Sequence, residues 1–242
     1  MSRLRCSVNV TRDVLELVHK RKAFAFLIDR QPLLSTASIW QRDNGDSHDV
    51  QVIAIGKTGY GKSTTLNQLV GEEVFETNDI HGCTRAMQSA EYRFQTAKGQ
   101  CYFSLADLPG IGEKPELDKQ YITLYRQAIQ KAHLVIYFLR ADQRDYSIDL
   151  LAFSELFKTS SERRKVILVI NAVDKIEPLN RCLSFELSWE QVQSLELKLT
   201  QVSAKFDVPE DRIVAVSAIE QFNLDKLTHK IAEHLLPFLQ IA

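Results

Sequence analysis

The chain has 242 residues, 45% hydrophobic and 25% charged, which is the balance of a soluble globular protein rather than a disordered or fibrous one. Thirty basic and 31 acidic side chains leave a formal net charge of −1. No overall field therefore attracts nucleic acid or anionic lipid, and sequence-specific DNA binding is not expected. The length suits one sizeable α/β domain with an extension but not two full domains.

Sequence features also bear on the compartment. No apolar run approaches the roughly 20 residues that span a bilayer, and the first residues lack the apolar stretch of a signal peptide. The four cysteines are widely spread without a C-x-x-C pair, which predicts free thiols rather than a zinc site or a disulfide framework. We therefore expect a cytoplasmic protein.

The first 48 residues differ in pattern from the rest. Apolar residues at helical spacing with interleaved Arg and Lys predict an amphipathic helix over residues 8–28, which is expected either to pack on the rest of the protein or to lie on a membrane or partner. Residues 29–49 contain Pro32, several Ser and Thr and an Asn-Gly pair, and predict a linker. The predicted division is an N-terminal helix and linker, 1–48, and a second domain, 49–242.

From residue 50 the pattern alternates between short apolar runs and helical stretches. The apolar runs, typical of strands buried on both faces of a parallel sheet, are 50–55, 101–106, 134–139, 166–170 and 213–216. The helical stretches are 62–70, 117–131, 148–158, 188–206 and 224–239. A looser alternation at 87–95 indicates one antiparallel edge strand.

The strongest motif follows the first apolar run. Residues 56–63 read Gly-Lys-Thr-Gly-Tyr-Gly-Lys-Ser, which satisfies G-x-x-x-x-G-K-[ST] between a strand and a helix. Glycines let backbone N–H groups wrap around phosphate oxygens, and the helix presents the positive end of its dipole. Lys62 is expected to neutralise the β- and γ-phosphates. The Ser63 hydroxyl is expected to bind Mg²⁺, a hard cation that prefers oxygen ligands.

A second motif, Asp107-Leu108-Pro109-Gly110, follows the run at 101–106. A carboxylate at a strand end is a suitable water-bridged ligand of Mg²⁺, so Asp107 joins Ser63 in the expected metal site. Gly110 can turn its N–H toward a γ-phosphate. These four residues are also a good turn sequence in isolation, and their position after the phosphate loop and a strand favours the nucleotide interpretation.

Two further motifs indicate which base is bound. Asn171-Ala172-Val173-Asp174 follows the run at 166–170, and a carboxylate can accept hydrogen bonds from the N1 and N2 donors of guanine, a pair that adenine lacks. Ser217-Ala218 ends the last apolar run, where a backbone N–H can meet guanine O6. Each short motif is weak alone, but four in this order, each just past a strand, predict guanine-nucleotide binding.

With these motifs, residues 49–240 resemble a GTPase domain of the Era, TrmE and septin superclass, and within it the bacterial YeeP and YfjP group. The resemblance rests on Gly-Lys-Thr-Gly-Tyr-Gly-Lys-Ser-Thr at 56–64, Cys-Thr-Arg at 83–85, Asp-Leu-Pro-Gly-Ile-Gly-Glu at 107–113 and Asp-Lys-Ile-Glu-Pro at 174–178. It implies an α/β, three-layer P-loop NTPase G domain with a mostly parallel six-stranded sheet, preceded by an N-terminal helix. It also implies that Thr84 closes on Mg²⁺ and the γ-phosphate in the triphosphate state.

Three positions depart from the patterns of related GTPases, although the resembling families also often have an apolar residue at the first of them. Ile111 stands where Ras-like enzymes carry a water-orienting glutamine, so turnover without a partner should be slow, of the order of 10⁻³ s⁻¹ or below. Gly59 replaces the asparagine that holds potassium in some relatives, and residues 59–61 look more like septin and chloroplast-import-receptor GTPases, which pair through their nucleotide faces. Ala172 replaces a lysine whose stem packs on guanine, which should weaken affinity.

Two functions are compatible with this sequence. One is a Mg²⁺-dependent GTPase switch, and the other is a septin-like module in which GTP gates dimerisation or assembly with negligible turnover. A third interpretation, an ATPase, is supported only by Ala172, and Asp174 argues against it. By resemblance alone, a ribosomal or membrane-associated partner stays open.

The expected site residues fall into three sets. Catalysis is assigned to Lys62, Thr84 and Gly110, and Mg²⁺ to Ser63, Thr84 and Asp107. GTP or GDP is expected to contact Lys57, Thr58, Gly59, Tyr60, Gly61, Lys62, Ser63, Thr64, Asn171, Asp174, Ser217 and Ala218.

Overall fold

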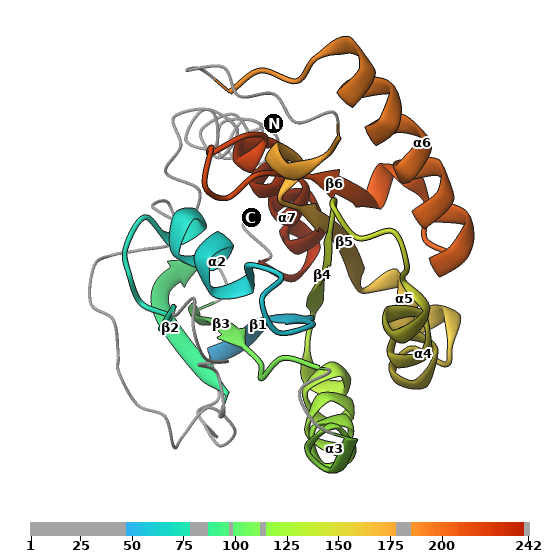
Figure 1. Cartoon of the computed structure of the whole chain (residues 1–242). Coiled ribbons are helices and arrows are strands. Elements are labelled where there is room, and N and C mark those ends of the chain that lie inside the picture. Colours follow the sequence, from blue (N-terminus) through green and yellow to red (C-terminus); the bar gives the residue numbers. More distant parts are fainter. Residues whose placement is uncertain (1–46, 78–86, 97–98, 112–114, 178–184, 240–242) are drawn as a thin grey trace.

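The computed structural model describes residues 47–77, 87–96, 99–111, 115–177 and 185–239, drawn in colour in Figure 1. The predicted helix at 8–28, most of the predicted linker and Thr84 lie outside these residues. None of the described helices is long and apolar enough to cross a membrane.

Six strands form one sheet in the order β2-β3-β1-β4-β5-β6. Their bounds are β1 (Ser47–Gly56), β2 (Gln88–Thr96), β3 (Gly99–Asp107), β4 (Leu134–Arg140), β5 (Val166–Asn171) and β6 (Ile213–Ala215). Neighbouring strands are parallel except β2 and β3, which confirms the mostly parallel sheet and its antiparallel edge strand. Because β1 begins at Ser47, pairing with Gln100, the predicted start of the second domain at residue 49 falls inside this strand.

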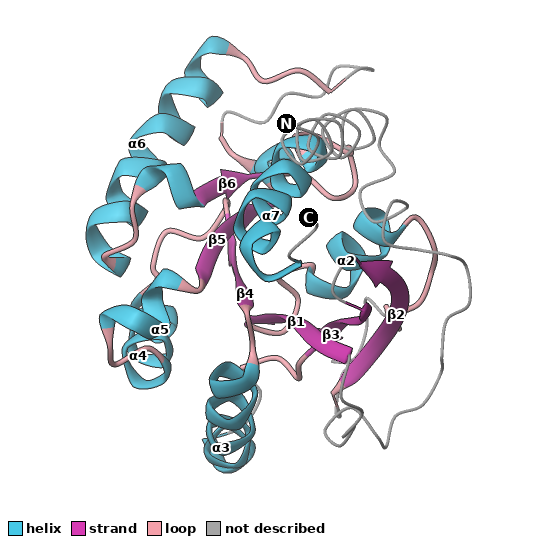
Figure 2. Cartoon of the chain, turned by 180° about the vertical axis from the view of Figure 1, so that it is seen from behind, coloured by secondary structure: helices cyan, strands magenta, loops and turns pink. Residues whose placement is uncertain are grey.

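Helices cover both faces of the sheet, giving the expected three layers (Figures 1 and 2). The helices are α2 (Lys62–Val70), α3 (Pro115–Lys131), α4 (Ser147–Leu156), α5 (Ser160–Arg164), α6 (Trp189–Phe206) and α7 (Leu224–Leu239), with single 3₁₀ turns at η1 (Val173–Lys175) and η2 (Glu210–Arg212). Residues of α2 and α7 share one hydrophobic core, and residues of α3, α4 and α6 share the other.

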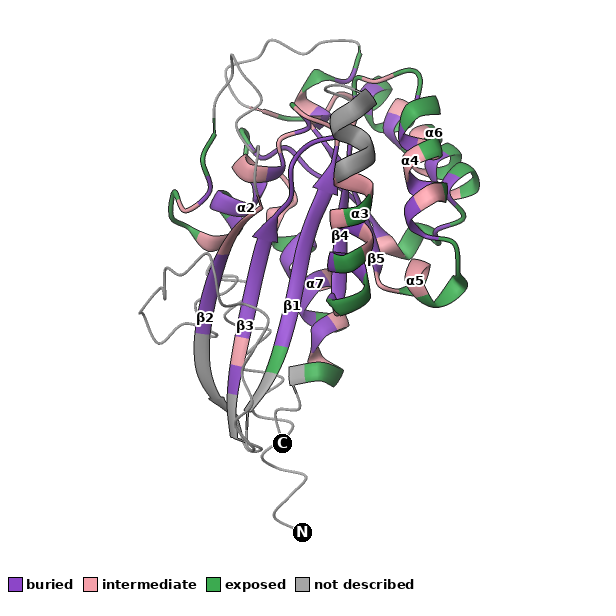
Figure 3. Ribbon diagram, turned by 90° about the horizontal axis from the view of Figure 1, so that it is seen from below, coloured by how far each residue is buried: buried purple, intermediate pink, exposed green. Residues whose placement is uncertain are grey.

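Strand side chains alternate between these two cores. In β1, Ile53 and Ile55 belong to the core under α3, whereas Val50, Val52 and Ala54 belong to the core under α2 and α7. Every residue of β5 is buried, and only the last residue of β4 is not. Figure 3 shows the same burial along the central strands. Continuous apolar runs are the sequence pattern that such doubly covered strands require.

The helix predicted at 148–158 is wrong at its end. Helix α4 stops at Leu156, and Phe157 leaves the helical region at φ −117° and ψ 76°. A short second helix, α5, begins at Ser160. Its N-cap is Thr159, whose side chain accepts from Glu162 N while the Glu162 carboxylate accepts from Thr159 N. This reciprocal capping box satisfies the first N–H groups of a new helix, so the chain turns instead of continuing α4.

Candidate functional site

The four sequence motifs lie at one edge of the sheet. Strands β1, β3, β5 and β6 all run in parallel, so their carboxyl ends open on the same side. The loop after β1, the turn after β3, the segment after β5 and the segment after β6 carry the motifs. In a sheet of this kind, the carboxyl edge is where ligands bind.

The loop after β1 curls around the side chain of Lys62. The Lys62 Nζ donates to the carbonyls of Gly56 and Lys57, at 3.2 Å each, and the residue is only 6% exposed. Gly61, at φ 79°, leads into α2, and a Cβ there would overlap the amide of Asn171. A residue without a Cβ is therefore required where the loop meets the end of β5. The ammonium group is held at the centre of the loop, as a phosphate cradle needs.

The two predicted Mg²⁺ ligands that the structure describes are in contact. The Ser63 hydroxyl, in the first turn of α2, donates a short hydrogen bond to Oδ2 of Asp107 at the end of β3, and Asp107 is fully buried. A hydroxyl and a carboxylate are the hard oxygen donors that Mg²⁺ prefers, and two protein ligands leave room for phosphate oxygens and water. This donor set fits the ion, which would neutralise charge on the transferring phosphoryl group when bound.

The turn after β3 is docked on the phosphate loop through its backbone. Ile111 N donates to Gly56 O at 3.2 Å, and Thr58 N donates to Ile111 O at 3.3 Å. The Ile111 side chain is 7% exposed and apolar, so it cannot orient a water molecule. A Cβ at Gly110 would lie 2.5 Å from Thr58 N, which is closer than atoms can pack. Only glycine allows the turn to approach the loop in this way.

Asn171 joins the phosphate loop to the last loop of the site. Its Nδ2 donates to Tyr60 O at 3.0 Å, its Oδ1 accepts from Ala218 N at 3.2 Å, and the residue is 5% exposed. One side chain thus fixes the loop after β1 and the segment after β6 relative to each other. The sequence predicted Asn171 as a nucleotide contact, but this bridging arrangement could not be inferred from spacing.

Asp174, the predicted guanine-reading carboxylate, is oriented by Ser217. The Ser217 hydroxyl donates to Asp174 Oδ1 at 2.6 Å and accepts from Glu220 N at 3.2 Å. The backbone N–H groups expected to reach guanine are engaged elsewhere, because Ser217 N donates to Phe222 O and Ala218 N donates to Asn171. A contact from Ala218 N to guanine O6 would be shared with, or replace, its bond to Asn171.

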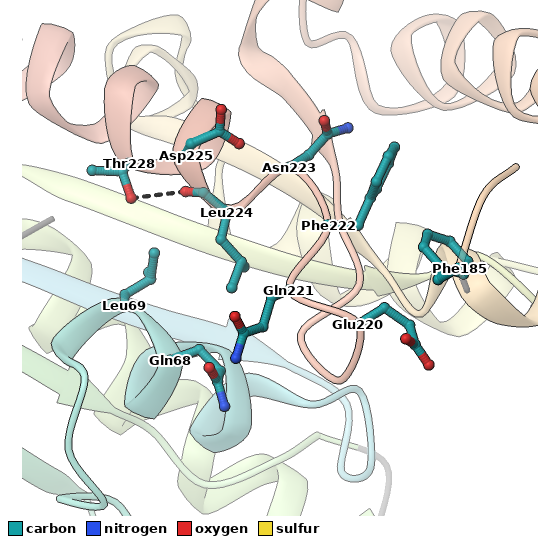
Figure 4. A pocket seen from close by; sticks show the side chains of 10 residues that line it. All are labelled: Gln68, Leu69, Phe185, Glu220, Gln221, Phe222, Asn223, Leu224, Asp225 and Thr228. Atoms are coloured by element: carbon teal, nitrogen blue, oxygen red, sulfur yellow. Dashed lines mark hydrogen bonds between the residues drawn. The ribbon is translucent and has the colours of Figure 1, made fainter. Parts of the chain in front are cut away.

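A separate hollow lies beside the base-binding segment. It has a volume of about 530 Å³ and is shown in Figure 4. Its lining residues, from α2, the segment around 220–223, the start of α7 and Phe185, are Gln68, Leu69, Phe185, Glu220, Gln221, Phe222, Asn223, Leu224, Asp225 and Thr228. It contains none of the residues predicted to bind nucleotide, and therefore is not the phosphate site.

At the carboxyl edge of one sheet lie a loop centred on Lys62, the Ser63–Asp107 pair and the Asp174–Ser217 pair, which is the arrangement of a P-loop G domain. A family model described as 50S ribosome-binding GTPase matches residues 51–172. The protein YfjP of Escherichia coli (strain K12) is 32% identical over 205 residues, which cover 84% of this chain and 69% of YfjP. The chain therefore belongs to this family of GTPases, which confirms the resemblance found in the sequence.

Solved structures show the same fold. Era of Aquifex aeolicus bound to GDP·AlF₄⁻ has a TM-score of 0.57 at 24% identity, covering 77% of this chain and 56% of Era. A dimerisation-deficient mutant of Toc33 from Arabidopsis thaliana has a TM-score of 0.56 at 18% identity, covering 77% of this chain and 84% of Toc33. The chain thus spans a little over half the length of Era. At these identities, the likeness shows the fold alone.

Proposed function

We propose that the protein is a Mg²⁺-dependent GTPase that hydrolyses GTP slowly and acts as a conformational switch. The observation that carries the proposal is the pair Asp174–Ser217. A carboxylate that accepts a hydrogen bond at 2.6 Å from a neighbouring hydroxyl is held in one orientation, and its oxygens have further lone pairs with which to accept hydrogen bonds from a base. Guanine offers two adjacent N–H donors to such an acceptor, and rejection of a base that lacks them follows from the unpaired carboxylate.

The switch resides in the turn at Gly110 and Ile111. Two backbone hydrogen bonds hold this turn on the phosphate loop, at Gly56 and Thr58. A γ-phosphate bound beside Lys62 offers the Gly110 N–H a charged acceptor, so the position of the turn depends on whether GTP or GDP is bound. Thr84 is proposed to respond to the same phosphate and to Mg²⁺.

Slow turnover follows from the side chain at 111. A buried isoleucine has no hydrogen-bonding group for the attacking water, so we expect an intrinsic rate of the order of 10⁻³ s⁻¹ or below. A partner that supplies a charged or polar group raises this rate.

The alternative is an assembly module in which GTP gates dimerisation and hydrolysis is incidental. The buried Ile111 is compatible with negligible turnover. Dimerisation has a parallel in Toc33 and Toc159, where it is important for GTPase activity. A ribosomal partner is suggested by the family description and by an Era structure in complex with MgGDPNP and a fragment of 16S ribosomal RNA. We propose a cytoplasmic location, with the residues before Ser47 as an extension of the G domain.

The test is calorimetric titration of wild type and Asp174→Asn with GDP, GTP and ATP in the presence of Mg²⁺. Wild type should bind GDP and GTP and not ATP. Asp174→Asn should lose GDP but bind xanthosine diphosphate, because the asparagine amide can donate to the C2 carbonyl that replaces the guanine amino group. Asp211→Asn, an exposed aspartate at η2, serves as the matched control and should bind GDP like wild type.

Phosphate release and sedimentation of the same samples separate the two functions. Turnover at concentrations where the protein is monomeric supports the switch. GTP-dependent association without phosphate release supports the assembly module and contradicts the switch. ATP binding equal to GTP binding would contradict both, because Asp174 would then not read guanine.

A further inference from the structure

Two bulky side chains of the phosphate loop converge on one buried carboxylate that no motif includes. Lys57 Nζ lies 3.0 Å from Oδ2 of Asp149, and the Tyr60 hydroxyl donates to the same oxygen at 3.2 Å. The Asp149 side chain is fully buried, whereas that of Lys57 is 18% exposed. Lys57 also lies 5.6 Å from the centre of the Tyr60 ring, within cation–π range. The three side chains form one cluster.

The cluster ties the phosphate loop to the start of α4. Asp149 lies in the first turn of α4, and its backbone carbonyl accepts from the Tyr137 hydroxyl of β4 at 3.2 Å. Arg140, the last residue of β4, donates from Nη1 to Gly59 O at 3.2 Å. Three residues of the loop, Lys57, Gly59 and Tyr60, are thus held by residues between the end of β4 and the first turn of α4.

Burying the Asp149 carboxylate costs free energy, because the charged group loses its contact with water. Burial raises the pKa of the Asp149 carboxyl, and the neighbouring Lys57 ammonium and Tyr60 hydroxyl act in the opposite direction. Among the described residues, Asp149 Oδ1 has no hydrogen-bond partner. A buried ion pair seldom stabilises a fold more than apolar residues of the same size would. Its contribution is to orientation, because a hydrogen-bonded ion pair fixes the positions of the side chains that take part in it.

A phosphate loop requires a fixed orientation of its backbone N–H groups. Its backbone N–H groups can point inward only if the side chains of the loop are held outward, and the loop contains two glycines, Gly59 and Gly61, that permit other conformations. Lys57 and Tyr60 are its large side chains on either side of Gly59. Anchoring both on Asp149 restricts the loop to the conformation that wraps around Lys62.

We propose that Asp149 is a positioning residue for GTP binding and hydrolysis, which acts through Lys57 and Tyr60 to hold the phosphate loop in its binding conformation. The inference rests on the proposed guanine-nucleotide site and adds to it a residue outside every nucleotide-binding motif. Asp149 does not touch the nucleotide. Its effect is therefore expected on the phosphates and not on the base.

The experiment compares wild type, Asp149→Asn and Glu155→Gln in their affinities for GDP and for guanosine monophosphate and in GDP dissociation rate. Glu155 is the matched control, because it lies on the same helix and pairs with Arg126 of α3, away from the phosphate loop. The ratio of the GDP and monophosphate affinities isolates the β-phosphate. Loss of a hydrogen bond to a charged group should lower that ratio about tenfold in Asp149→Asn and accelerate GDP release by a similar factor.

Glu155→Gln should leave both the ratio and the release rate as in wild type. An unchanged ratio in Asp149→Asn, or an equal change in Glu155→Gln, would overturn the proposal, because a general loosening of the fold affects both nucleotides alike. If Asp149→Asn does not fold, Tyr60→Phe removes one of the two contacts and should lower the ratio about threefold. Absence of GDP binding by the wild type would instead refute the nucleotide site itself, so the two failures are distinguishable.

Discussion

Gly110 is the residue at which a single missing Cβ decides how the switch turn meets the phosphate loop. A Cβ built there would lie 2.5 Å from Thr58 N and 2.6 Å from Thr58 Cα, so the overlap is with backbone as well as with the threonine side chain. Gly110→Ala should therefore displace the turn and lower GTP turnover about 100-fold, the cost typical of a small misplacement in an active site. Single-turnover phosphate release measures this.

A matched glycine distinguishes this effect from a general loss of stability. Gly71 ends α2 at φ 80° with open space around its missing Cβ, so Gly71→Ala should cost about 1 kcal/mol of stability without a change in turnover per folded molecule. Because the obstruction at Gly110 includes backbone atoms, Thr58→Ala should not rescue Gly110→Ala. Rescue would show that only the threonine side chain forbids the methyl group.

Burial of Cys101 should lower the stability of the fold at alkaline pH. The residue is fully buried in β3, and burial, with a smaller contribution from Asp49, raises the pKa of its thiol from 9.0 to about 12. A thiol that ionises more readily in the unfolded chain stabilises the fold fully below pH 9 and loses that contribution as the pH rises toward 12. At pH 10 the loss should be about 1 kcal/mol.

The measurement is the difference in unfolding free energy between wild type and Cys101→Ala from pH 7 to pH 10. The cavity left by alanine contributes an offset that does not depend on pH. The difference should therefore fall as pH rises, whatever its value at pH 7. A constant difference would mean that the thiol ionises equally in both states.

Helices and strands could be predicted from the sequence wherever the spacing of apolar residues alone determines their position. The bounds of α2 and α7 were predicted to the residue, and apolar runs located all five parallel strands. The break between α4 and α5 was missed, because Leu150, Phe153, Leu156 and Phe157 keep an apolar helical spacing up to the end of α4 and give no sign that the helix stops there. There the Thr159–Glu162 capping box competes with periodicity.

The same contrast holds for the site. Motif residues were predictable because each needs a fixed chemical group beside a strand end, and Lys62, Ser63, Asp107, Asn171 and Asp174 do meet at one edge of the sheet. The residues that hold the phosphate loop in place could not be predicted. Asp149 and Arg140 lie far along the chain from the loop they contact, and only the fold shows that α4 begins beside it.

Helix α6 offers a test of local signals at the scale of an element. Its first turn is closed by Ser188, whose hydroxyl accepts from Gln191 N at 3.3 Å while Gln191 Oε1 accepts from Ser188 N at 2.8 Å. Ser188→Ala should lower the unfolding free energy by about 1 kcal/mol. Ser194→Ala, in the middle of the same helix, should change it by less than about 0.5 kcal/mol. Urea denaturation of both variants decides; equal effects would mean that the cap is not what stabilises the helix.

In the part of the chain that the structure describes, two hydrophobic cores lie on either side of one sheet, and the proposed nucleotide site lies where both meet the carboxyl edge. The phosphate loop connects β1 to α2, which packs with one core, while Asp149 extends to it from α4 in the other. A nucleotide bound there would contact the phosphate loop, which is joined to α2 in one layer and to Asp149 of α4 in the other. Binding should therefore stabilise the cooperative unit as a whole and not only the loops.

GDP should raise the melting temperature by an amount that grows with the logarithm of the ratio of free GDP to its Kd. With Mg²⁺ and free GDP at about 100 times its Kd, linkage adds about 2.7 kcal/mol. For a chain of this size, that corresponds to a rise of roughly 5–10 °C. Asp174→Asn should show no shift with GDP and a comparable shift with xanthosine diphosphate, because the substitution changes base selection while the phosphate loop is intact. A single calorimetric transition that shifts to higher temperature with GDP supports coupling of both cores to the nucleotide. A second transition whose temperature does not change with GDP would show that one core unfolds independently of nucleotide binding.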